Sequence, residues 1–304
     1  MRITITGSTG LIGQALAESL LADGHDVTRL VRREPRATSD GTTEARWDPT
    51  AGTVDTAALA GSDAVVHLAG AGVGDHRWTP AYKQQIRDSR VLGTRTLATH
   101  LADLPADSRP GLFLSGSAIG YYGATGTNTV DETAPAGTDF LAEVCAAWEA
   151  AAAPAREAGI RTAHSRTGVV LSPRGGAFGR MLPLAKLGLG GPLGSGRQYW
   201  SVISLADAVA ALRYVIDTPA LDGPINVTQP RPVTNREVSS ALGRLLHRPA
   251  FFMVPSPALH LVLGEFAGSV LYSQKVVPTR LLEAGYPFRH PTLDDTLRAA
   301  LGKI

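Results

Sequence analysis

The 304-residue sequence predicts an α/β fold, in which a doubly wound parallel sheet is followed by a smaller mixed α/β lobe. Three observations lead to this class. Strand patterns alternate with helical patterns in the first half of the chain, and a glycine-rich turn joins the first strand to the first helix. After Leu171 the elements become short, and Gly and Pro become frequent. The predicted division is therefore a core of residues 1–171 and a C-terminal lobe of residues 172–304.

The first half begins with a complete βαβ unit. A buried strand is predicted at Arg2–Thr6, a helix at Leu11–Asp23 and a second strand at Asp26–Val31. This unit of about thirty residues has the size of a mononucleotide-binding half. The same alternation predicts strands at Ala64–Leu68, Gly111–Ser115 and Arg161–Leu171, and helices at Pro80–Leu101 and Thr138–Ala158.

The second half contains shorter predicted elements. Residues 172–196 predict a loop with one short helix, and further helices are expected at Asn235–Leu246, Leu259–Val270 and Leu293–Leu301. Helix 204–217 and strand 224–228 are expected to return to the parallel sheet. The tail, about residues 249–301, completes the predicted lobe.

Composition and charge argue against several classes of function. Apolar residues make up 44% and charged residues 18% of the chain, which favours a large buried core over disorder. A net charge of +2 without a basic stripe argues against a nucleic-acid partner. No apolar run reaches the roughly 18 residues of a membrane span, and no secretory leader pattern opens the chain, so no membrane partner is expected.

The cysteine and the histidines add three expectations. Cys145 is the only cysteine and cannot form an internal disulfide, so a reducing, cytoplasmic location is expected. The eight histidines lack metal-ligand spacing, so no metal site is expected. The sequence leaves the oligomeric state open, with a homodimer as one option.

The turn after the first strand has the spacing GxxGxxG. Gly7 permits a tight turn, Gly10 lets a pyrophosphate approach the backbone, and Gly13 lets the helix pack closely on the sheet. The helix N-terminus offers unpaired N–H groups and a partial positive charge to phosphates. A ligand-free turn is the alternative, but the position between strand and helix favours a Rossmann-type dinucleotide site over residues 7–13, including Thr9, Leu11 and Ile12.

The end of the second strand indicates which dinucleotide is bound. An NAD site usually places a carboxylate there to bind the ribose 2′-hydroxyl, whereas this chain has Arg32 and Arg33, with Glu34 following. Guanidinium groups pair with phosphate in a bidentate manner. We therefore expect NADP in preference to NAD. The alternative is that both arginines are solvated residues at the start of a loop.

Several segments together resemble a known family. The glycine turn, His67-Leu68-Ala69-Gly70, and Ser115-Gly116-Ser117 ahead of Tyr121-Tyr122-Gly123 are similar to the extended and atypical short-chain dehydrogenases/reductases. Segments 139–145, 166–171 and 188–196 resemble the epimerase-family branch, related to NAD-dependent epimerase/dehydratases, and the tail resembles that branch's small C-terminal conserved domain. The likeness covers essentially the whole chain.

The resemblance implies a seven-stranded parallel Rossmann sheet with a C-terminal substrate lobe over its carboxyl edge. It implies that Leu68, Ala69 and Gly70 pass close to the adenosine and ribose. Arg90 stands about where many relatives carry an Asn that shapes a proton relay, and we count Arg90 and Ser115 among the cofactor-binding candidates.

The catalytic pattern of that family is incomplete in this chain. Short-chain dehydrogenases use a hydroxyl residue, a Tyr and a Lys four positions later. Ser117 matches the hydroxyl position, but Phe140 stands where we expect the Tyr and Val144 where we expect the Lys. Tyr121 or Tyr122 is the candidate substitute, with Glu143 or Cys145 on the following helix.

Two functions therefore stay open. The first is an NADP-dependent oxidoreductase or epimerase-like enzyme acting on an unknown small molecule, with Ser117 polarising a substrate oxygen. The second is a non-catalytic NADP-binding protein with a regulatory or redox-sensing role, which the missing Tyr and Lys favour.

Overall fold

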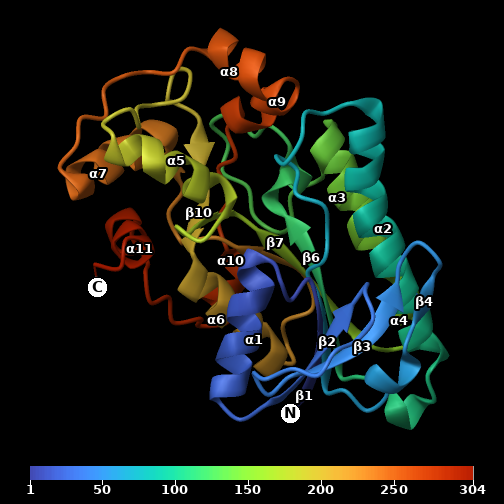
Figure 1. The fold of residues 1–304 in the computed structure, drawn as a ribbon. Coiled ribbons are helices and arrows are strands. Elements are labelled where there is room, and N and C mark those ends of the chain that lie inside the picture. Colours follow the sequence, from blue (N-terminus) through green and yellow to red (C-terminus); the bar gives the residue numbers. More distant parts are fainter. Residues whose placement is uncertain (304) are drawn as a thin grey trace.

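The computed structural model describes residues 1–303 and contains an eight-stranded sheet whose strands lie between Arg2 and Val227 (Figure 1). In spatial order its strands are β11 (Gly223–Val227), β7 (Arg161–Thr167), β6 (Leu112–Ala118), β5 (Ala64–His67), β1 (Arg2–Thr6), β2 (Asp26–Val31), β3 (Thr43–Asp48) and β4 (Thr53–Val54). The strand order changes direction between β1 and β5. Doubly wound sheets bind their ligands in the crevice at this point.

Seven of the strands run parallel, as the family resemblance implies, and β4 pairs antiparallel with β3 at the edge. Strands β3 and β4 were not predicted from the sequence. Their segment alternates charged and apolar residues, with Ala45 and Trp47 facing the core, and is too short and polar to stand out as a buried strand.

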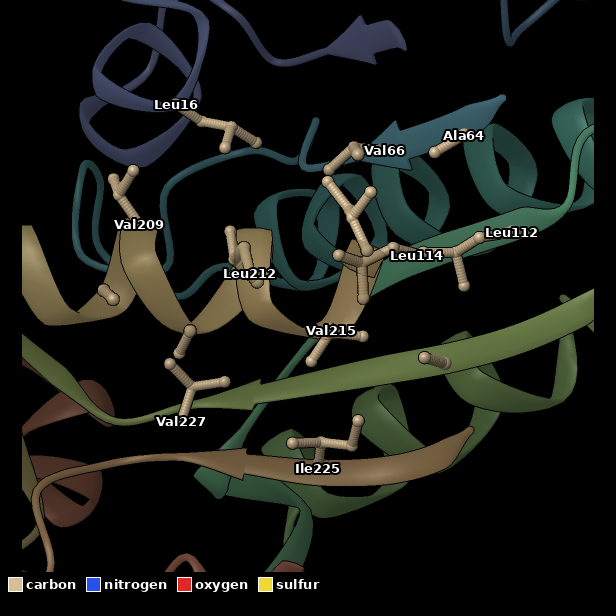
Figure 2. Close-up of a cluster of buried hydrophobic side chains, with 14 of the residues drawn as sticks. Leu16, Ala64, Val66, Leu112, Leu114, Val209, Leu212, Val215, Ile225 and Val227 are labelled. Atoms are coloured by element: carbon tan, nitrogen blue, oxygen red, sulfur yellow. The ribbon is translucent and has the colours of Figure 1, made fainter. Parts of the chain in front are cut away.

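Helices cover both faces of the sheet. Helices α1 (Leu11–Ala22) and α6 (Leu205–Asp217) cover one face, where Leu16, Val209 and Leu212 point at apolar side chains of the strands, as Figure 2 shows. The opposite face is covered by α2 (Pro80–Asp103), α3 (Phe140–Ala150) and α4 (Ala153–Glu157), and Phe113 is buried there. Short 3-10 turns occur at η1 (Thr56–Ala58), η2 (Ala106–Ser108) and η3 (Ile119–Tyr122).

The C-terminal lobe lies above the carboxyl ends of the strands in Figure 1. Its helices are α5 (Gly176–Lys186), α7 (Asn235–Leu246), α8 (Ser256–Leu263), α9 (Phe266–Leu271), α10 (Thr279–Glu283) and α11 (Leu293–Ala300). Two small sheets join them: β8 (Val169–Leu171) with β10 (Val202–Ser204), and β9 (Tyr199–Trp200) with β12 (Val233–Thr234). Phe178, Trp200 and Leu297 belong to the lobe's own apolar cluster.

Three predicted elements are interrupted in the structure. The predicted helix Thr138–Ala158 is two helices, α3 and α4, because Pro154 lacks the N–H that would continue the helix. The predicted strand Arg161–Leu171 divides at Gly168, where a side chain would collide with the backbone of Ser201. The predicted helix Leu259–Val270 divides at Gly264, which has a φ of 63°.

Strand β11 pairs with β7 at the edge of the main sheet, and α6 packs on the face shared with α1. No helix within residues 1–303 is both long and apolar enough to cross a bilayer.

Candidate functional site

A cleft of about 980 Å³ runs along the carboxyl ends of β1, β2 and β5. The predicted cofactor-binding residues that line it are Gly7, Thr9, Gly10, Arg32, Arg33, Leu68, Ala69 and Gly70. Residues that the sequence analysis did not single out also line it: Trp47, Pro49, Thr50, Asp75, His76, Gln84 and Gln85. The remaining predicted cofactor-binding residues stand outside this lining: Leu11, Ile12, Gly13, Arg90 and Ser115. The predicted catalytic residues Ser117, Tyr121 and Tyr122 are also outside it. A second cleft of about 1040 Å³, bordered by α1, α6 and α11, contains none of the predicted site residues.

The glycine turn needs its glycines for steric reasons. Gly7 has a φ of 68°, and a Cβ there would lie 2.6 Å from the carbonyl carbon of Leu68. A Cβ on Gly13 would overlap the backbone of Gly7. Gly10 is the N-cap of α1 and provides no side-chain cap, so the amide groups of the first turn stay available to an anion.

The two predicted 2′-phosphate residues differ in their surroundings. Arg33 is held by the carboxylate of Glu44, with Nη–Oε distances of 2.6 and 2.7 Å, and this pairing lowers the pKa of Glu44. Arg32 is exposed, borders the cleft, and has no hydrogen-bond or ion-pair partner within residues 1–303. Arg32 is therefore the free guanidinium at this end of the cleft. The sequence pattern did not predict that Glu44, on β3, pairs with Arg33.

A buried pair supports the loop that follows β5. The Thr6 hydroxyl accepts hydrogen bonds from the amides of Leu68 (3.2 Å) and Ala69 (3.3 Å) and lies 2.6 Å from Nδ1 of His67. Because the two amides use both lone pairs of this hydroxyl, it donates its proton to Nδ1, which leaves the proton of His67 on Nε2, a nitrogen without a partner within residues 1–303. Burial lowers the pKa of His67 to about 3, so the imidazole is neutral.

The hydroxyl of Ser117 is engaged by a buried ion pair. It donates to Oε1 of Glu149 at 2.7 Å, and Arg166 binds the same carboxylate through Nε and Nη2, both at 2.8 Å. Ser117 is 6% exposed. A hydroxyl has a single proton to donate, so the expectation that Ser117 polarises a substrate oxygen is not supported by this geometry.

The two candidate tyrosines have different environments. Tyr122 is buried, donates to Oδ1 of Asn226 at 2.8 Å and accepts from Arg166 at 2.9 Å, and burial raises its pKa to about 12. Tyr121 is half-buried, and the guanidinium carbon of Arg166 lies 3.4 Å from the centre of its ring. The Tyr121 hydroxyl has no hydrogen-bond partner within the described chain and is the one candidate hydroxyl left available.

Helix α3 presents a different pair of residues to this region than the sequence analysis expected. Phe140 packs edge-on against Trp78 at 5.0 Å, and Val144 is buried against α2. Leu141 and Cys145, one position later, instead lie next to Gly120, which belongs to the loop after β6.

Neither pair can move a proton as a Tyr-Lys pair does. Burial raises the pKa of Cys145 to about 12, which keeps it a neutral thiol, and Glu143 points to solvent. Neither Phe140 with Val144 nor Leu141 with Cys145 therefore supplies the usual acid–base pair.

Arg90 lies behind the loop that follows β5. Its Nη1 donates to the carbonyls of Ala71 (2.9 Å) and Ile86 (3.0 Å), and its guanidinium stands 5.1 Å from the centre of the Trp148 ring. A Cβ on Gly70 would lie 3.3 Å from its guanidinium carbon, so Arg90 packs directly under a residue that lines the cleft. Within residues 1–303 no carboxylate pairs with it.

These features define a class of protein. A glycine turn at an uncapped helix N-terminus, set at the point where strand order reverses, is a Rossmann-type nucleotide-binding site. Residues 3–227 match the model of the NAD dependent epimerase/dehydratase family, and residues 254–300 match a domain of unknown function, DUF1731. The chain belongs to the NAD dependent epimerase/dehydratase family.

Full-length relatives agree with this assignment. The chain is 47% identical over 296 residues to the epimerase family protein Mb2239 of Mycobacterium bovis, covering 97% of this chain and 96% of the relative. The crystal structure of human epimerase family protein SDR39U1 (isoform 2) with NADPH matches with a TM-score of 0.89 and 32% identity over 100% of both chains. A nucleoside-diphosphate sugar epimerase from Corynebacterium glutamicum matches with a TM-score of 0.80 and 34% identity, over 99% of this chain and 58% of that one.

Proposed function

We propose that this chain binds NADP(H) in preference to NAD(H) and acts as an NADP-dependent oxidoreductase or epimerase-like enzyme on a small molecule. The observation that supports this most directly is Arg32, a guanidinium without a partner at the end of β2, where an NAD site has a carboxylate. The NADPH in the human SDR39U1 crystal structure supports the same cofactor. The buried single cysteine is consistent with a cytoplasmic location.

The residues present fit such a cofactor. The amides at the start of α1 and the bare backbone at Gly7 and Gly10 would hold the diphosphate, and Arg32 the 2′-phosphate. Leu68, Ala69 and Gly70 would border the ribose. The cofactor itself supplies the hydride, so the chain must bind, orient and provide a proton.

Among the three candidate hydroxyls, that of Tyr121 is the one free to provide that proton. Its hydroxyl is available, and the stacked Arg166 fixes its ring next to the end of β6. Ser117 supports this arrangement indirectly, since it hydrogen-bonds the carboxylate that holds Arg166.

A second candidate function is a non-catalytic NADP-binding protein. The observation that favours it is the apolar pair Leu141 and Cys145 facing the loop after β6, together with the occupied hydroxyl of Ser117. Such a chain would hold the dinucleotide without turning it over.

Cofactor binding is tested with Arg32→Ala and the matched variant Arg33→Ala. We expect Arg32→Ala to weaken NADPH by about 10- to 100-fold in calorimetry and to leave NADH almost unchanged, because one bidentate phosphate contact is lost. Arg33→Ala should have a smaller effect, since Glu44 occupies its guanidinium. Equal losses for NADPH and NADH in Arg32→Ala would contradict the 2′-phosphate assignment.

Turnover is tested by NADPH oxidation against a library of carbonyl compounds and nucleotide sugars. We expect Tyr121→Phe to abolish activity that the matched variant Tyr272→Phe retains, with NADPH binding intact in both. Tight NADPH binding without turnover of any compound would favour the non-catalytic function.

A further inference from the structure

The C-terminal lobe exposes an unusual concentration of large apolar side chains. Residues 1–303 expose eleven such side chains in all, and six of them lie in two short segments of the lobe. We call these six the apolar patch: Leu184, Leu187, Leu189, Phe251, Phe252 and Met253, each between 51% and 74% exposed. Single exposed apolar residues are common on protein surfaces, but a group of this kind marks an interaction site.

The two segments run side by side. Arg248 donates through Nε to the carbonyl of Lys186 at 2.9 Å, and a Cβ on Gly188 would lie 3.1 Å from Pro249. Further along, Leu193 and Val254 form a parallel bridge. In Figure 1 the two segments are the end of α5 and the orange connection from α7 to α8, on the part of the lobe remote from α2 and α4. The two segments that carry the apolar patch are therefore neighbours in the lobe.

The two segments that carry the apolar patch have charge of a single sign. No Asp or Glu occurs between Glu157 and Asp207, and none between Glu237 and Glu265, so both segments of the patch lie in acid-free stretches. Lys186 and Arg248 are exposed on these segments, and neither has a carboxylate partner within the described residues. An occupant of the apolar patch must therefore combine an apolar layer with negative charge.

We propose that the apolar patch docks on the surface of an anionic lipid bilayer. The side chains of Phe251, Phe252 and Met253 would enter the boundary between headgroups and acyl chains, while Lys186 and Arg248 contact the headgroup phosphates. A second copy of the chain fits less well, because a two-fold contact through this surface would place the same cations on both sides. The proposal does not depend on the proposed function. It departs from the expectation of no membrane partner, which rested on the absence of a spanning segment.

Vesicle co-sedimentation of the full-length chain tests this docking. Vesicles of phosphatidylcholine containing phosphatidylglycerol should retain the protein at low salt, and vesicles of phosphatidylcholine alone should retain much less. Retention should fall at high salt, because the headgroup attraction is screened. We expect Phe251→Ser/Phe252→Ser and, separately, Lys186→Glu/Arg248→Glu to weaken binding by about tenfold or more.

Leu282→Ser is the matched control, because Leu282 is an exposed apolar residue outside the patch and its loss should leave vesicle binding unchanged. Unchanged melting temperatures would show that the variants remain folded. Absence of binding to either vesicle type would overturn the proposal, as would binding that Phe251→Ser/Phe252→Ser leaves intact. A dimer in solution that this same variant dissociates would assign the patch to a second copy instead.

Discussion

The carboxyl edge of the sheet has two ends with opposite properties. At the β1–β2 end, the groups that can contact a ligand are unpaired: the first-turn amides of α1 have no side-chain cap, and Arg32 has no partner among residues 1–303. At the β6–α3 end, the charged groups are paired with other protein groups, whereas the Tyr121 hydroxyl and the indole nitrogen of Trp148 have no partner within residues 1–303. Ser117, Glu149 and Arg166 form one hydrogen-bonded unit, and Tyr122 continues it to Asn226.

This contrast shows that holding a dinucleotide and moving a proton are separate properties of the fold. Donors at the β1–β2 end have no protein partner and can exchange water for a ligand, as is typical of a binding site. Paired groups at the β6–α3 end stabilise the chain itself. The Rossmann-like fold of the family is present, while α3 contains neither a Tyr nor a Lys, and Leu141 and Cys145 lie against Gly120.

Breaking the ion pair at the β6–α3 end should have the largest effect on stability. Glu149→Gln leaves the buried guanidinium of Arg166 without its counter-charge, and we expect the free energy of unfolding to fall by about 3–5 kcal/mol. Urea unfolding monitored by circular dichroism measures this change.

A double variant separates charge burial from packing. Glu149→Gln combined with Arg166→Met should lose less free energy of unfolding than the two single variants lose together, because no unpaired charge is left. If Glu149→Gln instead unfolded like the natural chain but lost all turnover, Glu149 would be part of the reaction chemistry and the contrast between the two ends would fail.

Local patterns predicted most of the parallel sheet and both helical layers. The glycine spacing was sufficient to place the cleft, because its steric requirements are local: Gly7 must turn, and Gly13 must lie against Gly7. The interruptions at Gly168 and between α3 and α4 were missed, since they depend on where another segment passes or on a single Pro within an alanine-rich run.

The paired groups of the site were not predictable from the sequence. Glu149 and Arg166 are 17 residues apart and meet only when α3 packs on β6, the strand next to β7. Likewise, Glu44 reaches Arg33 through β3, a strand that the sequence pattern did not reveal. Whether Val144 or Cys145 faces the loop after β6 depends on the rotation of α3 about its axis. A shift of one residue changes the direction of a side chain by about 100°.

The buried His67 should make the stability of the chain depend on pH. The expected effect is smaller than that of breaking the ion pair and larger than that of Ser117→Ala. Its pKa is about 3 in the folded chain and 6.5 in model compounds, so the unfolded chain binds more protons between these values. The stability tied to neutral His67 is complete above pH 6.5 and falls as the pH decreases toward 3.

Replacing this imidazole by an amide should remove that dependence. From about pH 7.5 to about pH 5, the natural chain should lose about 2 kcal/mol more stability than His67→Gln, measured by urea unfolding at each pH. The buried His164, whose pKa burial also lowers, is present in both chains, so the difference reports on His67 alone. Parallel pH curves for the two chains would show that the pKa of His67 is the same in the folded and the unfolded chain, and that burial does not hold it as a neutral acceptor of Thr6.

Ser117→Ala is expected to have the smallest effect, and that small effect is informative. The hydroxyl donates to a carboxylate that two bonds from Arg166 already satisfy, so its loss should cost only about 1 kcal/mol of stability. NADPH affinity should stay within about twofold of the natural chain, because Ser117 is outside the lining of the cleft. Any turnover found with the carbonyl library should also persist, since the hydroxyl has no second proton to offer a substrate.

A loss of roughly 100-fold or more in kcat, with NADPH affinity retained, would mean that substrate binding turns this hydroxyl away from Glu149. The β6–α3 end would then be a catalytic site that assembles only when occupied, and the difference between the two ends would disappear in the bound state.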